Sequence, residues 1–190
     1  MINIDSKIKS LHLEKQLTLD DLPQVDLYMD QVIQLFEGIY EDTLRNDAEK
    51  VLTKTMINNY SKGKLLFPIK NKKYTNDHLL LMSLIYQLKG GLCITDIKTS
   101  LDKINKKVVE EDEFPLSDLY RSYLTLANQN IVTFEQNVNQ SVEHVESEIS
   151  GLEGVNLESM ERFLLVCSFI HMSNLYRRVA QMLVDEMKNE

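Results

Sequence analysis

Apolar residues recur at helical spacing along most of the chain. Over residues 27–40 they fall three and four positions apart, which predicts a helix with one buried face that begins near Pro23. Asp20 or Asp21 is expected to cap this helix, with the proline in its first turn, where a missing N–H is tolerated. Residues 1–18 have no such period and are expected to form an extended or loosely attached arm.

A short helix followed by a basic turn is predicted in the middle of the chain. The helix spans residues 54–62, with Thr53 as its N-cap and Gly63 as the left-handed residue that ends it. After it, two short extended arms around a basic turn at Asn71 predict a small β-hairpin. We call this predicted hairpin, over residues 67–74, the wing.

Four more helices are predicted, over residues 78–89, 95–103, 117–149 and 157–187. Asn76 or Asp77 is expected to cap the first of them, and a segment with two glycines turns the chain between the last two. The predicted fold is therefore all-α with a small β-hairpin wing. Its expected parts are an N-terminal arm (1–19), a central domain that contains the wing (20–107) and a C-terminal helical hairpin (116–190).

The two long C-terminal helices carry more apolar positions than an isolated hairpin can bury. They are expected to pack against the preceding domain, a second subunit or both, so a homodimer is predicted. Their mixed tyrosine, methionine and phenylalanine content leaves a pocket for a small-molecule effector as an alternative, although core packing is the commoner reason for such residues.

Composition agrees with a helical globular protein. Of the 190 residues 43% are hydrophobic, and only 6 are glycine and 3 proline, which favours long helices. No apolar run is long enough to cross a membrane, and the first residues lack the apolar core of a signal peptide. The sequence therefore predicts a cytoplasmic protein without a membrane partner.

Charge is distributed unevenly along the chain. Residues 51–107 carry a net charge of +8, whereas residues 1–50 carry −6 and residues 108–190 carry −10. A basic block of this kind favours phosphate binding, because the local field matters more than the net charge. The alternative is that the basic block pairs with the acidic flanks, inside one fold or across a dimer.

Residues able to support catalysis or metal binding are scattered. Cys93 and Cys167 have no partner at metal-ligand spacing and are expected to be buried reduced thiols. We expect His78 to be exposed in the first turn of a helix, His144 to lie on a solvated acidic face, and His171 to be a core or interface residue. With no nucleophile–base pair and no glycine-rich phosphate loop, neither an enzyme nor a cofactor is predicted.

The order of helix, glycine-terminated turn, basic hairpin and two helices resembles the MerR family of transcriptional regulators, over residues 52–101. The matching positions are Thr53, Met56, Ile57, Tyr60, Gly63, Leu65, Leu66, Pro68, Tyr74, Asp77, Gly91, Ile94 and Ile97. This resemblance implies a winged helix-turn-helix and dimerisation through a helix after the wing. As a whole, the sequence resembles more closely the bacterial domain-of-unknown-function family 1836, with which it shares YMDQV and LTKTMINNYSKGKLL; that resemblance implies the fold and no established activity.

The predicted helix 54–62 separates an apolar face from a polar one. If it buries Met56, Ile57 and Tyr60, its other face presents short polar and basic groups suited to DNA. The candidate DNA-binding residues are Lys54, Thr55, Asn58 and Lys62 in this helix and Lys70, Lys72 and Lys73 in the wing. The sequence therefore predicts a transcriptional regulator that binds double-stranded DNA. The alternative is a non-catalytic interaction module whose basic block meets an acidic protein surface.

Overall fold

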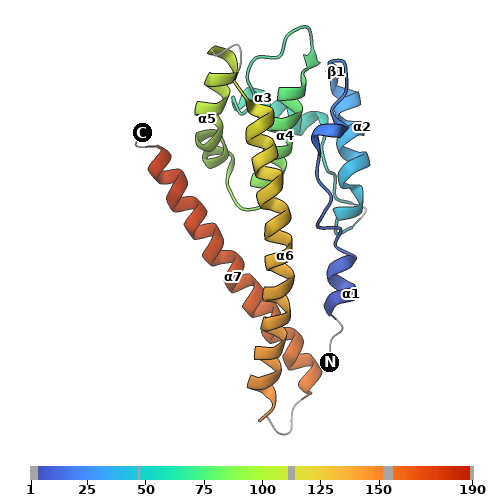
Figure 1. Ribbon diagram of the computed structural model, residues 1–190, viewed down its shortest axis with the longest axis vertical. Coiled ribbons are helices and arrows are strands. Elements are labelled where there is room, and N and C mark those ends of the chain that lie inside the picture. The colour runs from blue at the N-terminus through green and yellow to red at the C-terminus, as the bar shows by residue number, and fades with distance from the viewer. Residues whose placement is uncertain (1–3, 47, 111–113, 152–155, 189–190) are drawn as a thin grey trace.

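The computed structural model describes residues 4–46, 48–110, 114–151 and 156–188. Its helices are α1 (Ile4–Lys9), α2 (Met29–Tyr40), α3 (Lys54–Lys62), α4 (Asn76–Leu88), α5 (Ile94–Glu110), α6 (Leu116–Ile149) and α7 (Leu157–Met187), and its two strands are β1 (Leu27–Tyr28) and β2 (Lys73–Tyr74). We call α2–α5 with the two strands the head, and α6 with α7 the hairpin (Figure 1). The prediction of a mostly helical protein with a small antiparallel sheet is confirmed. None of the described helices combines the length and the apolar content needed to cross a bilayer.

The first helix of the head begins later than predicted. It starts at Met29 rather than near Pro23, because the two residues before it form β1 and pair with β2. Gln31 Oε1 accepts a hydrogen bond of 2.9 Å from the Tyr28 backbone N–H at the start of α2. The acidic residue expected to cap α2 instead closes a 3-10 turn, where Asp21 Oδ2 accepts 2.7 Å hydrogen bonds from the N–H and the hydroxyl of Thr18.

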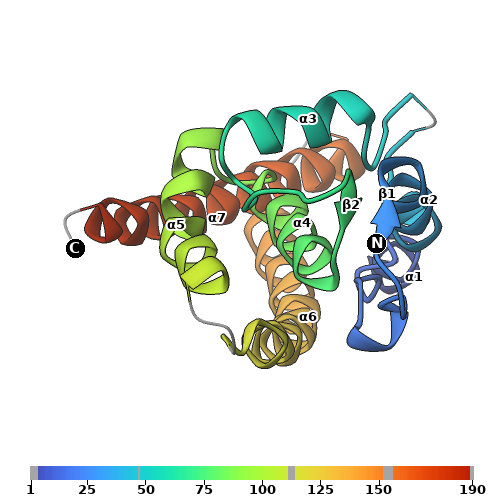
Figure 2. The same ribbon diagram turned by 90° about the horizontal axis from the view of Figure 1, so that it is seen from above.

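The wing takes its sheet partner from outside the predicted hairpin. A tight turn joins Lys70 to Lys73, with a 3.0 Å hydrogen bond from the Lys73 N–H to the Lys70 carbonyl. Beyond this single bridge, β2 pairs with β1 in antiparallel register, Leu27 opposite Tyr74 and Tyr28 opposite Lys73. Viewed from above, the strands lie beside α2, and α3 runs along one side of the head (Figure 2).

The core of the head extends into segments at both ends of the predicted domain. Leu17 of the expected arm, and Leu116 and Tyr120 of α6, belong to the same buried cluster as the apolar faces of α2, α3, α4 and α5. The arm also contains a helix, α1, which contacts α6 and in which Ile8 is buried. The N-terminal segment is therefore part of the folded structure rather than an extended, loosely attached arm.

A closed ring of four hydrogen bonds lies at the centre of this core. The Leu17 N–H donates to the Tyr40 hydroxyl oxygen at 3.1 Å, and the Tyr120 hydroxyl donates to the Leu17 carbonyl at 2.8 Å. The Ser83 hydroxyl completes the ring, 2.9 Å from that of Tyr40 and 2.8 Å from that of Tyr120. The ring joins the N-terminal segment, α2, α4 and α6 at one point.

The two long helices of the hairpin form a V. They pack together at the end away from the head, where Val145, Ile149 and Leu165 are buried, and then diverge toward the head (Figure 1). The far end of α7 rests against α5, and the ammonium group of Lys188 lies 3.4 Å from the Asp96 carboxylate. The predicted helices over 117–149 and 157–187 are confirmed to within one residue.

Three side chains, those of Cys93, Cys167 and His78, are not placed as expected. Cys93 and Cys167 are both exposed. Cys93 precedes α5 and its thiol bonds the Asp96 carboxylate at 3.2 Å, while Cys167 lies on a side of α7 that α6 leaves open. His171 is exposed on α7, so it does not lie in the core of the chain, and its expected alternative position in an interface stays a prediction. His144 is exposed as expected. His78 is buried rather than exposed, for a reason that involves the wing.

Candidate nucleic-acid interface

Helix α3 is built by local interactions that the sequence specifies. The Thr53 hydroxyl oxygen caps it by accepting a 3.2 Å hydrogen bond from the Met56 N–H. Ile57 and Tyr60 are buried, and Met56 is half-buried, so this side of the helix joins the core. The expected N-cap and the apolar face of the helix are confirmed.

The candidate residues of α3 occur together on its exposed side. Lys54, Thr55, Asn58 and Lys62 are all exposed, and their spacing places them on one face of a helix. Lys54 is not a free cation, because its ammonium lies 2.7 Å from the carboxylate of Asp30 in α2. Lys62 forms no ion pair within the part of the chain that the structure describes.

The end of α3 differs from the prediction in one detail. Lys64, with φ 57°, is the left-handed residue, while Gly63 keeps helical angles. The Leu65 N–H bonds the Tyr60 carbonyl at 2.9 Å and the Lys64 N–H bonds the Ser61 carbonyl at 3.1 Å, which together form a Schellman ending. A Cβ on Gly63 would lie 2.7 Å from the Leu65 side chain, so glycine leaves room there for a buried leucine and is not used for its backbone angles.

The three lysines of the wing differ in their exposure to solvent. Lys70 and Lys72 are exposed, and the turn from Lys70 to Lys73 holds Asn71 (φ 53°) and Lys72 (φ 59°) in the left-handed region. Lys73 is half-buried, and its ammonium lies 5.5 Å from the centre of the Tyr28 ring. The turn therefore presents two of the three predicted lysines to solvent and commits the third to packing on β1. Lys64 is a further exposed cation, which the sequence reasoning missed although it lies in the basic block.

His78 supports the wing from behind. Its Nδ1 accepts hydrogen bonds from the Thr75 N–H at 3.1 Å and the Thr75 hydroxyl at 2.8 Å, so its Nε2 carries the proton and faces the Phe67 carbonyl at 3.3 Å. The Phe67 ring centre is 3.8 Å away, and the Tyr74 ring meets His78 edge-on. Burial lowers the pKa of His78 to about 4, opposed by the Phe67 carbonyl and by Asp26. His78 is thus a neutral anchor for the wing, and Thr75, not Asn76 or Asp77, is the N-cap of α4.

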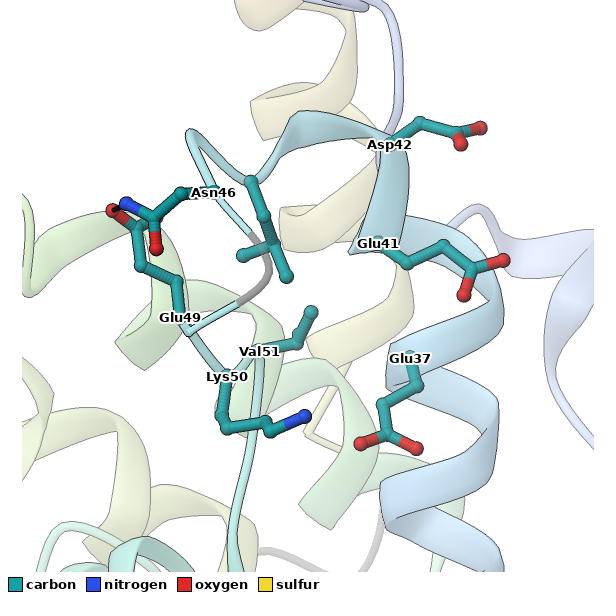
Figure 3. A pocket seen from close by; sticks show the side chains of 8 residues that line it. Glu37, Glu41, Asp42, Asn46, Glu49, Lys50 and Val51 are labelled. Carbon is teal, nitrogen blue, oxygen red and sulfur yellow. Dashed lines mark hydrogen bonds between the residues drawn. The ribbon is translucent and has the colours of Figure 1, made fainter.

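An acidic hollow lies beside the start of α3. It measures about 500 Å³ and is lined by the end of α2 and the segment that leads to α3. Its charged groups are Glu37, Glu41, Asp42 and Glu49, with Lys50 extending toward Glu37 across it (Figure 3). No group of histidine, cysteine, aspartate and glutamate side chains among the described residues is arranged to hold a metal ion. Because carboxylates repel phosphate, the hollow is not part of the basic surface formed by α3, Lys64 and the wing turn.

Comparison with protein-family models finds one matching family. The model of the family described as Domain of unknown function (DUF1836) matches residues 17–123. This chain belongs to the DUF1836 family. The DUF1836 region begins at Leu17 and ends just beyond Tyr120, so both ends of it lie at the hydrogen-bonded ring. No curated protein and no solved structure matches the chain.

Proposed function

We propose that this protein is a transcriptional regulator that binds duplex DNA through the exposed face of α3 and the wing turn, in a MerR-like winged helix-turn-helix. The proposal rests on the division of α3 into a buried apolar side and an exposed side of polar and basic residues. Ile57 and Tyr60 anchor one side of it in the core, and the other side offers an amide, a hydroxyl and a lysine to solvent. A rigidly held helix with short polar groups facing outward is suited to a major groove.

Each exposed group has a role that its chemistry supports. The Asn58 amide can donate to and accept from one adenine edge, which gives it the ability to read sequence. Lys62, Lys70 and Lys72 are point charges suited to phosphates, which fix position without reading bases. The wing turn lies on a segment braced by β1 and by His78, so the backbone that carries its lysines is held against the head.

The ion pair between Lys54 and Asp30 does not remove Lys54 from the proposed interface. Both side chains are more than half exposed, and exposed pairs of this kind contribute less than about 1 kcal/mol. A DNA phosphate can therefore replace the Asp30 carboxylate as the partner of Lys54 at little cost.

Titration of the full-length protein with a labelled random-sequence duplex over a series of salt concentrations tests the proposal. We expect binding that weakens steeply with salt, because each phosphate contact releases counterions. The double variant Lys70→Ala/Lys72→Ala should flatten the dependence of log affinity on log salt by about two units, at about one unit per contact. The matched control, Lys7→Ala/Lys9→Ala, removes the same charge from exposed positions on α1 and should leave the slope unchanged.

Two outcomes would contradict the proposal at different points. An unchanged slope in the wing variant would remove the wing from the interface and leave α3 alone. Absence of binding by the wild-type protein at low salt would reject DNA as the partner and favour an acidic protein surface instead.

A further inference from the structure

One side of α7 carries a regular apolar stripe of which only the first part is covered. Leu165 and Phe169 pack against α6 in the closed end of the hairpin, and Leu165 is only 4% exposed. Seven residues further along, on the same side of the helix, Met172 and Tyr176 are 39% and 64% exposed. Another seven residues along, Val179 and Leu183 are exposed as well. We call the residues Met172, Leu175, Tyr176, Val179, Met182 and Leu183 the open seam.

The open seam is uncovered because the head holds α7 away from α6. Val184 is buried near the end of α7, where the helix rests against α5. Lys188 adds ion pairs with Asp96 of α5 and with Asp185 of its own helix. With one end of α7 packed on α6 and the other in contact with α5, the two long helices stay apart between these points (Figure 1). The open seam is therefore left uncovered by the described part of the chain.

The area exposed by the chain is larger than a compact monomer of its size requires. Its accessible surface is 12784 Å² for a mass of 22.1 kDa, against about 9,300 Å² expected from the scaling of monomer surface with mass. The excess is about 3,500 Å², and large permanent dimers bury roughly 1,000–2,500 Å² on each partner. A dimer interface of that class fits within the excess.

We propose that a second copy of this chain covers the open seam and closes the two hairpins into a helical bundle. Helix α6 covers the first part of the apolar stripe on α7. The partner that covers the rest should therefore be a similar long helix with an apolar face, such as α6 or α7 of a second copy. The second copy brings such surfaces, since Leu126, Val132 and Phe134 of α6 are exposed too. None of the six residues of the open seam is charged, and the cores of dimer interfaces are depleted in charge in the same way. The dimer does not depend on the proposed binding of DNA.

Sedimentation of the full-length protein over a wide concentration range tests this proposal without DNA. The wild-type chain should sediment as a dimer. The double variant Tyr176→Glu/Val179→Glu places two carboxylates in the seam, where the dimer would bury them without partners, so the dimer dissociation constant should rise by about a hundredfold or more. Since both positions are exposed within one chain, the helix content measured by circular dichroism should stay unchanged.

The control is Val109→Glu on α5. Val109 is 57% exposed, close to the 55% of Val179, but it lies outside the seam, so this variant should remain a dimer. A wild-type monomer at every concentration would overturn the proposal. A seam variant that stays dimeric would overturn it too, because the interface would then lie elsewhere.

Discussion

Side chains of α3 divide into those that build the helix and those that face solvent, and the structure separates the two groups residue by residue. Ile57 and Tyr60 are buried in the core, and Gly63, just after the helix, leaves room for the Leu65 side chain. The Asn58 side chain makes no contact of this kind with the described residues. A change at Asn58 therefore tests recognition rather than folding.

Asn58→Ala should relax the preference for one or two base pairs, weakening the preferred site by about 1–3 kcal/mol. Binding to random DNA should hardly change, because a neutral amide releases no counterions. Lys62→Ala should behave differently and weaken both DNAs about equally. Titration of both variants against a selected and a scrambled duplex measures the difference. Equal losses on the two duplexes for Asn58→Ala would make it a structural residue.

His78 gives the stability a dependence on pH with a definite sign. Its pKa falls from 6.5 to about 4 on folding, so the unfolded chain binds the proton first and stability is lost as the pH falls from 6.5 toward 4. The total effect is about 3 kcal/mol. His78→Gln keeps an acceptor for the Thr75 N–H but cannot titrate. Urea unfolding at a series of pH values should therefore show a shallower loss for this variant than for the wild type, and parallel curves would contradict the assignment.

At the scale of elements, the features that were predicted correctly are those specified by residues close together in the sequence. The Thr53 cap with the buried Ile57 and Tyr60, and the periods of α6 and α7, depend on residues within a few turns, and the structure confirms them. The pairing of β1 with β2 joins two-residue strands that are far apart in sequence, and so short a strand has no period to detect. His78 is buried for the same kind of reason, because Phe67 covers it from another segment. The sequence predicted a set of exposed lysines in the wing, but it did not indicate that Lys73 packs on Tyr28.

The ring in the core links elements that no local pattern connects, and its removal should be measurable. Tyr120→Phe leaves the Leu17 carbonyl and the Ser83 hydroxyl without one partner each, which should lower the free energy of unfolding by about 2 kcal/mol. Tyr123→Phe is the matched control on the same helix. The Tyr123 hydroxyl makes no hydrogen bond to a described residue, although burial raises its pKa to about 12, and its loss should change stability by less than about 1 kcal/mol. Equal effects of the two variants in urea unfolding would mean that the ring contributes nothing particular.

At the scale of the whole molecule, the two proposals together fix the symmetry of the DNA site. A dimer built on a two-fold axis presents two copies of α3 related by that axis. Selection from a random duplex pool should therefore return a two-fold symmetric sequence, and a duplex that holds one half of it should bind much more weakly. The seam variant Tyr176→Glu/Val179→Glu should lose most of the difference between the full and the half site. An asymmetric selected site would contradict the combination.

The donors and acceptors of the four hydrogen bonds in the ring can be arranged in only one order. A backbone N–H can only donate and a carbonyl can only accept, so Leu17 obliges Tyr40 to accept and Tyr120 to donate. The remaining protons must follow: Tyr40 donates to Ser83, and Ser83 donates to Tyr120. Bonds aligned head to tail in this way polarise one another. One residue of the N-terminal segment, acting through its main chain alone, thus sets the orientation of every hydroxyl in the ring.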